Sequence, residues 1–170
     1  MNSFLDRWNG LPDHEAVAEI LPCCGSRNWA ERLAGRRPFA DADALFTASD
    51  AVWAQLGPAD WDEAFASHPR IGEKKAPASA TARSAEWSSR EQSGVATAGV
   101  DIQERLKRAN AAYENRFGRT YIVCASGKSA AEMLAILERR MSNDDAAELR
   151  EAAEQQRQIT QLRLRKWLQT

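Results

Sequence analysis

The residues best suited to proton transfer in this 170-residue chain lie in the segment His68-Pro69-Arg70-Ile71-Gly72. An amphipathic helix is expected just before it, because Trp61 and Phe65 lie four positions apart. Pro69 disfavours helical backbone angles at His68, so this helix should stop at or just before His68. An imidazole at the negative end of a helix dipole is biased toward its protonated form and can donate a proton near neutral pH. The alternative is a surface histidine at the end of a helix. Because the chain has only 2 histidines, few others compete for the role of proton donor.

A second group of polar residues lies in the segment from Ser84 to Gly94, which is nearly all polar apart from Trp87. Ser88, Glu91 and Gln92 stand at positions i, i+3 and i+4 and so share one face of a helix. This face could hold a polar ligand. On spacing alone, a solvated surface face is the simpler explanation.

Two more features suit a ligand site. The run from Thr120 to Ala125 is the one β-branched and aromatic stretch in the sequence, too short and solitary to form a sheet. If it is buried, its backbone groups need partners, and a bound ligand could be one. Arg163, four residues after Ile159 and four before Trp167, should be drawn toward the core, as a snorkelling side chain or a carboxylate clamp.

The composition predicts one globular domain over residues 1–170. Hydrophobic residues make up 44% of the chain, enough for a sizeable core, and 23 basic against 24 acidic residues leave a net charge of −1. This balance argues against a nucleic-acid or anionic-membrane partner. No apolar run approaches the roughly 18 residues of a membrane span, and the N-terminus lacks the apolar core of a signal peptide. A cytoplasmic location is therefore expected.

Three cysteines are present, Cys23, Cys24 and Cys124. An odd count with an adjacent pair is a poor framework for disulfides and agrees with a reducing compartment. Together with His14, they do not give the spacing of a metal site, so no metal ligands are expected.

Hydrophobic periodicity predicts an all-α fold of about eight or nine helices, with a mobile loop between Gly72 and Ser84. Gly118 is a good helix stop, and Ser129 with Glu132 reads as a capping box. Other expected N-caps are Asp13, either Asp41 or Asp43, and Asn143. The helices are expected over residues 4–11, 14–21, 29–34, 44–56, 58–67, 84–94, 101–117, 130–141 and 144–167.

Seven motifs in this order resemble the OHCU decarboxylase family over nearly the whole chain. They are Arg37-Pro38-Phe39, His68-Pro69-Arg70-Ile71-Gly72, the segments 88–94, 110–118 and 121–129, Asn143-Asp144, and Ile159-Thr160-Gln161-Leu162-Arg163-Leu164. Each motif is weak alone, but their order and separations make a specific match. One departure is visible, because no proline stands before Trp29.

Enzymes of that family act on 2-oxo-4-hydroxy-4-carboxy-5-ureidoimidazoline (OHCU) in the route from urate to (S)-allantoin. The resemblance therefore implies a carboxy-lyase with an all-helical fold, commonly a homodimer, that works without metal or organic cofactor. Two other functions stay open: a non-catalytic all-α module that binds a urate-pathway metabolite, and a protein–protein adaptor whose six tryptophans mark the interface. The core-facing spacing of most tryptophans disfavours the adaptor.

The resemblance also implies roles for individual residues. His68 and Glu91 match catalytic positions, with His68 as the acid that protonates the carbanion. Arg163 matches a substrate-anchoring arginine. The full set implied to bind substrate is Pro69, Ser88, Ser89, Arg90, Glu91, Gln92, Tyr121, Ile122, Val123, Cys124, Ala125 and Arg163.

Overall fold

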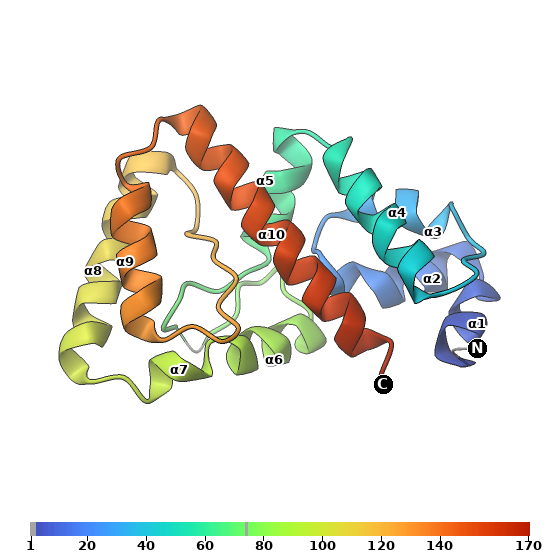
Figure 1. Cartoon of the computed structure of the whole chain (residues 1–170), viewed down its shortest axis with the longest axis horizontal. Helices are drawn as coiled ribbons and strands as arrows, with labels where there is room; N and C mark the ends of the chain where they lie inside the picture. The colour runs from blue at the N-terminus through green and yellow to red at the C-terminus, as the bar shows by residue number, and fades with distance from the viewer. Residues whose placement is uncertain (1–2, 74) are drawn as a thin grey trace. The chain divides into compact units, whose positions relative to one another are not determined.

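The computed structural model describes residues 3–73 and 75–170, and within them it is all-α, as the sequence predicts (Figure 1). The described residues form ten α-helices and one short 3-10 turn, η1, where about eight or nine helices were expected. No helix among them is both long and apolar enough to cross a membrane. The elements in chain order are α1 Ser3–Asn9, α2 Asp13–Ile20, η1 Leu21–Cys23, α3 Arg27–Ala34, α4 Ala42–Ala54, α5 Pro58–Ala66, α6 Ala82–Glu91, α7 Ser93–Ala96, α8 Val100–Phe117, α9 Ala130–Arg140 and α10 Asp145–Trp167.

The chain divides into two compact units. Unit 1 comprises residues 1–64 and 157–170, and unit 2 comprises residues 65–156. Both boundaries fall inside helices, within α5 and within α10. The single domain expected over residues 1–170 stays a prediction.

Unit 1 has a core built around indole rings. Trp8, Trp29 and Trp167 are fully buried, and the Trp8 and Trp167 rings meet edge to face with centroids 5.3 Å apart. The Phe39 ring stacks on Trp8, with centroids 6.1 Å apart. Aromatic pairs of this kind add to the free energy gained by burial. These tryptophans are therefore core residues, as their helical spacing predicts.

The motif at residues 37–39 fixes the chain between α3 and α4. The Arg37 guanidinium donates hydrogen bonds to the carbonyl oxygens of Trp8 and Leu11, at 2.8 and 2.9 Å. The Phe39 backbone exchanges two hydrogen bonds with the side chain of Asn9. This motif satisfies backbone groups in unit 1, which is a structural role.

Unit 2 has its core between α8, α9 and the segment that follows α8. On α8, Leu106, Tyr113 and Phe117 are buried, and the Tyr113 ring packs against the rings of Phe117 and Tyr121 at 4.8 and 5.4 Å. The core members are Ile71, Val95, Leu106, Tyr113, Phe117, Tyr121, Val123, Ala125, Ala130, Met133, Leu134 and Leu137.

Several helix ends agree with the sequence. Helix α5 ends at Ala66, so His68 lies just beyond it, and α8 ends at Gly118, which adopts the left-handed conformation with φ +69°. Ser129 and Glu132 form the expected capping box at the start of α9. Local sequence rules predict these ends because every group involved is local.

Two expected N-caps are wrong. Pro12 holds the cap position of α2, and Asp13 is the first residue of that helix. At α10 the cap is Asp144, whose Oδ1 accepts a hydrogen bond from the N–H of Ala147 at 2.7 Å, and the Asn143 amide instead bonds to glutamates of α10. Where two adjacent residues can both serve as the N-cap, tertiary contacts decide which one does.

The predicted helix over residues 84–94 begins earlier and is interrupted. Thr81 and Ser84 form a capping box, so α6 starts at Ala82. Gln92 leaves helical geometry with ψ +26°, which separates α6 from the one-turn α7. Gln92 thus lies at a bend between two helices.

Candidate active site

His68 is buried at the end of α5 and held by a glutamine of α10. Its exposed fraction is 9%, so the alternative of a surface histidine is excluded. Its Nε2 lies 2.7 Å from Oε1 of Gln156, which is itself fully buried. Since an amide oxygen can only accept a hydrogen bond, this contact is a hydrogen bond when Nε2 carries the hydrogen.

The segment from Tyr121 to Ala125 is buried at all five positions and belongs to no helix or strand, as predicted. Its backbone is anchored by side chains from two helices. The N–H of Cys124 donates to Oε1 of Gln155 on α10 at 2.8 Å, and the Arg140 guanidinium on α9 donates to the Ile122 carbonyl at 2.7 Å. We call this segment the buried strip.

Other backbone groups of the buried strip remain available. Within the described residues, no hydrogen bond engages the N–H groups of Ile122, Val123 and Ala125. Buried backbone N–H groups are almost always paired in proteins. Three unengaged donors in one buried segment are therefore unusual and mark the buried strip as a candidate binding element.

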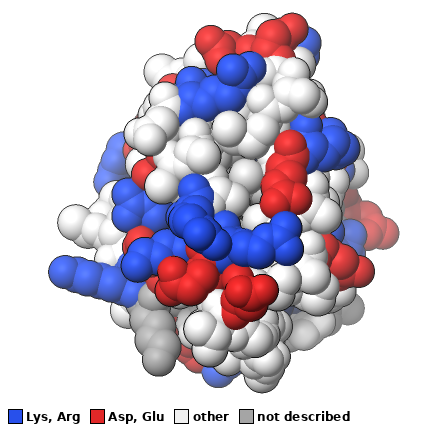
Figure 2. Space-filling model, turned by 90° about the vertical axis from the view of Figure 1, so that its left-hand side faces the viewer, with Lys and Arg blue, Asp and Glu red and all other residues white. Residues whose placement is uncertain are grey.

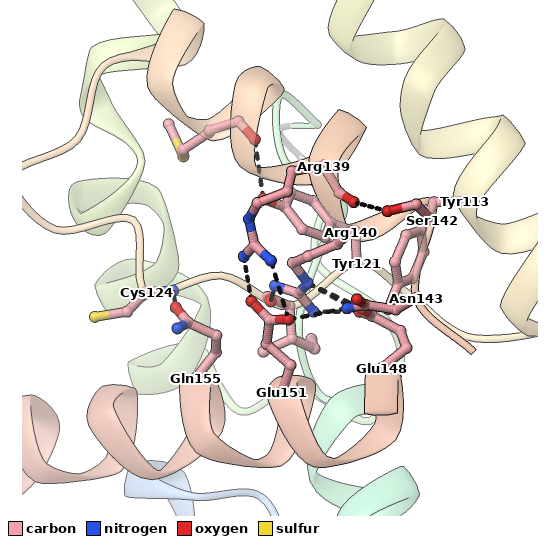
Figure 3. A network of polar contacts seen from close by, with 12 residues as sticks. Tyr113, Tyr121, Cys124, Arg139, Arg140, Ser142, Asn143, Glu148, Glu151 and Gln155 are labelled. Carbon is pink, nitrogen blue, oxygen red and sulfur yellow. Dashed lines mark hydrogen bonds and ion pairs between the residues drawn. The ribbon is translucent and has the colours of Figure 1, made fainter. Parts of the chain in front are cut away.

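An ion pair between α9 and α10, itself buried, holds the buried strip in place (Figure 3). Arg140 and Glu148 are both fully buried, and Arg140 Nη2 lies 2.5 Å from Glu148 Oε1. The Tyr113 hydroxyl donates to the same carboxylate, and burial followed by this hydrogen bond raises the pKa of Tyr113. Burial lowers the pKa of Arg140, but the hydrogen bond and charge of Glu148 outweigh it, so the net direction is upward and the guanidinium stays charged.

The predicted face of α6 is only partly enclosed. Ser88 is buried, whereas Glu91 and Gln92 are half-buried. Gln92 Oε1 accepts a hydrogen bond from the N–H of Gly72 at 2.8 Å, which joins the end of α6 to the segment after His68. The simpler expectation of a fully solvated face is wrong for Ser88.

Ser89 and Arg90 of α6 are both exposed. The Arg90 guanidinium pairs with Glu86 one turn earlier, at 2.5 Å. Both partners are more than half exposed, so this contact is a surface pair. Substrate binding by Ser89 and Arg90 stays a prediction.

Unit 2 contains a cavity of about 980 Å³ between the segment after His68, helices α6 and α7, and α8. Three of the residues expected to bind substrate line it, namely Pro69, Ser89 and Gln92. Asn110 of α8 also lines it and donates to the Ile71 carbonyl at 2.9 Å, which holds the loop at the cavity wall.

Arg70, from the motif at residues 68–72, links the segment after His68 to α8 at this cavity. Its guanidinium binds both carboxylate oxygens of Glu114, at 2.5 and 2.9 Å, and also Glu73. The hydrogen bond with Glu114 is the main reason the pKa of Arg70 is raised. On the face of the molecule drawn in Figure 2, basic and acidic side chains lie next to one another.

Arg163 belongs to unit 1, whereas the other residues expected at the site belong to unit 2. Its exposed fraction is 1%, so the snorkelling alternative is wrong. Its Nη1 lies 3.4 Å from the carbonyl oxygen of Pro22. Burial raises the pKa of the nearby Cys24 thiol to about 12, partly offset by hydrogen bonds and by the charge of Arg163.

The family model described as OHCU decarboxylase matches residues 9–165, which is most of the chain. The chain belongs to the OHCU decarboxylase family.

Three relatives give the extent of this likeness. The uric acid degradation bifunctional protein TTL of Arabidopsis thaliana is 35% identical over 144 residues, which cover 85% of this chain and 44% of that protein. The 2-oxo-4-hydroxy-4-carboxy-5-ureidoimidazoline decarboxylase of Haloferax volcanii is 27% identical over 94% of this chain and 93% of its own length. The decarboxylase of Amia calva is 35% identical over 46% of this chain. This chain spans less than half the length of the Arabidopsis thaliana and Amia calva relatives, at 44% and 45%.

Solved structures show the same fold. A crystal structure of OHCU decarboxylase in the presence of (S)-allantoin matches with a TM-score of 0.77 and 33% identity, over 89% of this chain and 98% of the other. A crystal structure of (S)-allantoin synthase matches with a TM-score of 0.71 over 96% of this chain and 53% of the other. At 18% identity, the second likeness concerns the fold alone.

The described residues of this OHCU decarboxylase family member contain no group of three or more His, Cys, Asp or Glu side chains arranged to hold a metal ion. Cys23, Cys24 and Cys124 are all buried and free of disulfide bonds.

Sequence reasoning missed three residues that support the site: Arg140, Gln155 and Gln156. Their partners are 18, 31 and 88 positions away, beyond the reach of local spacing rules. One signal exists for Gln156, which falls between Ala152 and Ile159 on the apolar face of α10. A polar residue on such a face needs a buried partner.

Proposed function

We propose that this protein catalyses the cofactor-independent decarboxylation of OHCU to (S)-allantoin. The observation that carries the proposal is the buried strip, because the unengaged N–H groups of Ile122, Val123 and Ala125 suit a polar heterocycle or a developing negative charge. Membership of the OHCU decarboxylase family supports the choice of reaction.

The reaction needs no metal or organic cofactor as electron sink. When the bond to the carboxylate breaks, carbon dioxide leaves, and the electron pair passes into the ring to give an enolate-like intermediate. Donors that are already in position stabilise this charge without reorganisation. In the proposal, N–H groups of the buried strip supply this stabilisation.

His68 is proposed to protonate the resulting carbanion on one face and so to set the S configuration. Its imidazole is buried and fixed by Gln156, which suits delivery from one direction. Glu91 is proposed to accept the substrate's hydroxyl proton or to orient its ureido N–H groups, and it is half-buried on α6.

The remaining residues are proposed to hold the substrate. Gln92 has an amide that can donate and accept, and Ser88 a hydroxyl that can do both. Arg163 is proposed to bind a ring or ureido carbonyl or the carboxylate. A grip on the departing carboxylate that is too strong would stabilise the ground state and slow the reaction. Pro69, Ser89 and Arg90 are proposed to complete the wall of this site.

A coupled assay tests the proposal. Urate, urate oxidase and hydroxyisourate hydrolase generate the unstable substrate in place, and circular dichroism follows optically active allantoin. We expect rapid growth of the (S)-allantoin signal when the protein is added. The variant His68→Ala should fold normally and lose most of this activity. Slow formation of racemic product with or without the protein would refute the proposal.

The competing function is a module that binds a urate-pathway metabolite without converting it. Calorimetry with (S)-allantoin, together with the coupled assay, separates the two functions. Binding without turnover would favour the module. The charged pair at Arg70 and the buried His68 give no support to a general protein–protein adaptor.

We further propose that the protein acts as a homodimer, as the family resemblance suggests, and that it is cytoplasmic, in keeping with its three free cysteines. Light scattering coupled to size-exclusion chromatography measures the mass directly. A species of 18.9 kDa at micromolar concentration would contradict the dimer.

A further inference from the structure

Gln156 is a buried amide with several apolar neighbours on its own helix. It is fully buried on α10, and its neighbours on the same face, Ala152, Ala153 and Ile159, are buried apolar residues. Burying an amide costs free energy unless it is hydrogen-bonded. Its Oε1 meets this need at His68 Nε2, 2.7 Å away.

This hydrogen bond determines which imidazole nitrogen changes its protonation. Because Oε1 can only accept, Nε2 keeps its hydrogen in both the neutral and the charged forms of the ring. The proton that His68 gains and loses is therefore carried by Nδ1. A neutral ring with its hydrogen on Nδ1 would place two lone pairs against each other at Nε2 and Oε1.

The preceding residue on α10, Gln155, holds the buried strip by a hydrogen bond. Gln155 Oε1 accepts from the N–H of Cys124 at 2.8 Å. Successive residues of an α-helix point about 100° apart, so one turn of α10 supports two separate parts of unit 2. Gln155 is thus a natural comparison for Gln156, with the same side chain on the same helix and a different partner.

We propose that Gln156 is a positioning residue that fixes the orientation and the tautomer of His68, so that Nδ1 is the proton-exchanging nitrogen. The catalytic part of this inference rests on the proposed function, whereas the tautomer does not. Gln156 acts through His68, and Gln155 acts through the backbone of the buried strip.

Imidazole nitrogen NMR tests the tautomer directly. The chain has only 2 histidines, and the other, His14, is exposed and contacts only Glu15 among the described residues at 3.8 Å. The variant His14→Gln therefore leaves His68 as the one imidazole in the long-range proton–nitrogen spectrum. Above its pKa, the ring should show its hydrogen on Nε2. A spectrum with the hydrogen on Nδ1 in this otherwise native protein would overturn the proposal, whatever any other variant does.

Two substitutions at Gln156 separate hydrogen bonding from packing. Gln156→Met keeps the length and approximate volume of the side chain and removes the amide oxygen, so the spectrum should change to a mixture of tautomers. Gln156→Glu keeps an accepting oxygen at the same place, and the Nε2–H tautomer should persist. An unchanged spectrum in folded Gln156→Met would show that other contacts set the tautomer.

Kinetics then link the tautomer to turnover. We expect Gln156→Met to lower kcat on the order of 10- to 100-fold with little change in KM, because misplacing a catalytic group by about 1 Å can cost a hundredfold. Gln156→Glu should restore part of kcat. The matched variant Gln155→Met should leave the His68 spectrum unchanged. If the wild type shows the expected tautomer but no turnover, the proposed function fails while the structural assignment of Gln156 stands.

Discussion

At the scale of single residues, two neighbouring arginines of α9 show how burial decides the importance of an ion pair. The Arg139 side chain is 59% exposed and pairs with Glu151, whereas the Arg140 side chain is 0% exposed and pairs with Glu148 (Figure 3). Exposed pairs are screened by water, but a buried carboxylate that loses its partner is left as an uncompensated charge.

We therefore expect Arg140→Met to lower the free energy of unfolding by about 3–5 kcal/mol, the range for breaking a buried pair. Arg139→Met should cost less than about 1 kcal/mol. Urea unfolding followed by circular dichroism measures both values.

A double variant tests the cause of that loss. Arg140→Met combined with Glu148→Met removes both charges, and so should recover part of the stability. Equal losses for the two arginine variants would contradict the assigned role of burial.

Cys24 provides a second prediction at this scale, based on its raised thiol pKa of about 12. Since the thiolate is the reactive form, Cys24 should resist alkylation in the folded protein up to about pH 10 and react readily after unfolding. The unfolded thiol ionises near its ordinary pKa of 9.0, so the stability that Cys24 contributes is present below pH 9 and is lost as the pH rises toward 12. Peptide mapping after alkylation measures this site separately from the other cysteines. Rapid labelling of Cys24 in native protein at pH 8 would disprove this resistance to alkylation.

The sequence predicts the chemistry-bearing residues better than their supports. His68 and the buried strip stand out locally, one by the following proline and the other by its isolated β-branched run. Gln156 and Arg140 do not, because their roles arise only when distant segments meet. The spacing leaves two alternatives for Arg163, a snorkelling side chain or a carboxylate clamp, and its burial excludes the first.

At the scale of elements, helix ends in this chain are set by local conformation wherever a special backbone geometry is needed. Gly118 ends α8 with φ +69°, and an added Cβ would meet nothing within 4 Å. A substitution there therefore tests backbone strain alone, without a steric clash against neighbouring residues.

We expect Gly118→Ala to lower the free energy of unfolding by about 1–2 kcal/mol, the cost of a left-handed conformation for a residue with a Cβ. Gly118→Asn should cost less, because asparagine tolerates this conformation better. Thermal denaturation of the two variants gives the comparison. Equal stability of Gly118→Ala and the wild type would mean that the helix end relaxes to another conformation.

Most elements follow from periodicity, and the errors occur where two neighbouring residues can serve the same purpose. Asn143 and Asp144 both suit an N-cap, and the choice falls to Asp144 because the Asn143 amide reaches Glu148 and Glu151. The bend at Gln92 has a different cause, since its hydrogen bond to Gly72 links segments 20 positions apart, beyond the reach of local spacing rules.

At the scale of the whole molecule, α10 is the element that both units share. Its first half, up to Gln156, belongs to unit 2 and carries Glu148, while its second half belongs to unit 1 and ends at the buried Trp167. Five of the six tryptophans lie in unit 1, and only Trp87 lies in unit 2. Indole fluorescence can therefore report on unit 1 by itself.

Because α5 and α10 each contribute residues to both units, we expect residues 1–170 to unfold as one cooperative domain. In a Trp87→Phe background, the fluorescence transition of unit 1 and the far-UV circular dichroism transition of the whole chain should coincide in urea. Adding Arg140→Met, a change confined to unit 2, should shift both midpoints by the same amount. If only the dichroism transition moved and the fluorescence transition stayed in place, the two units would be separate domains joined by α5 and α10.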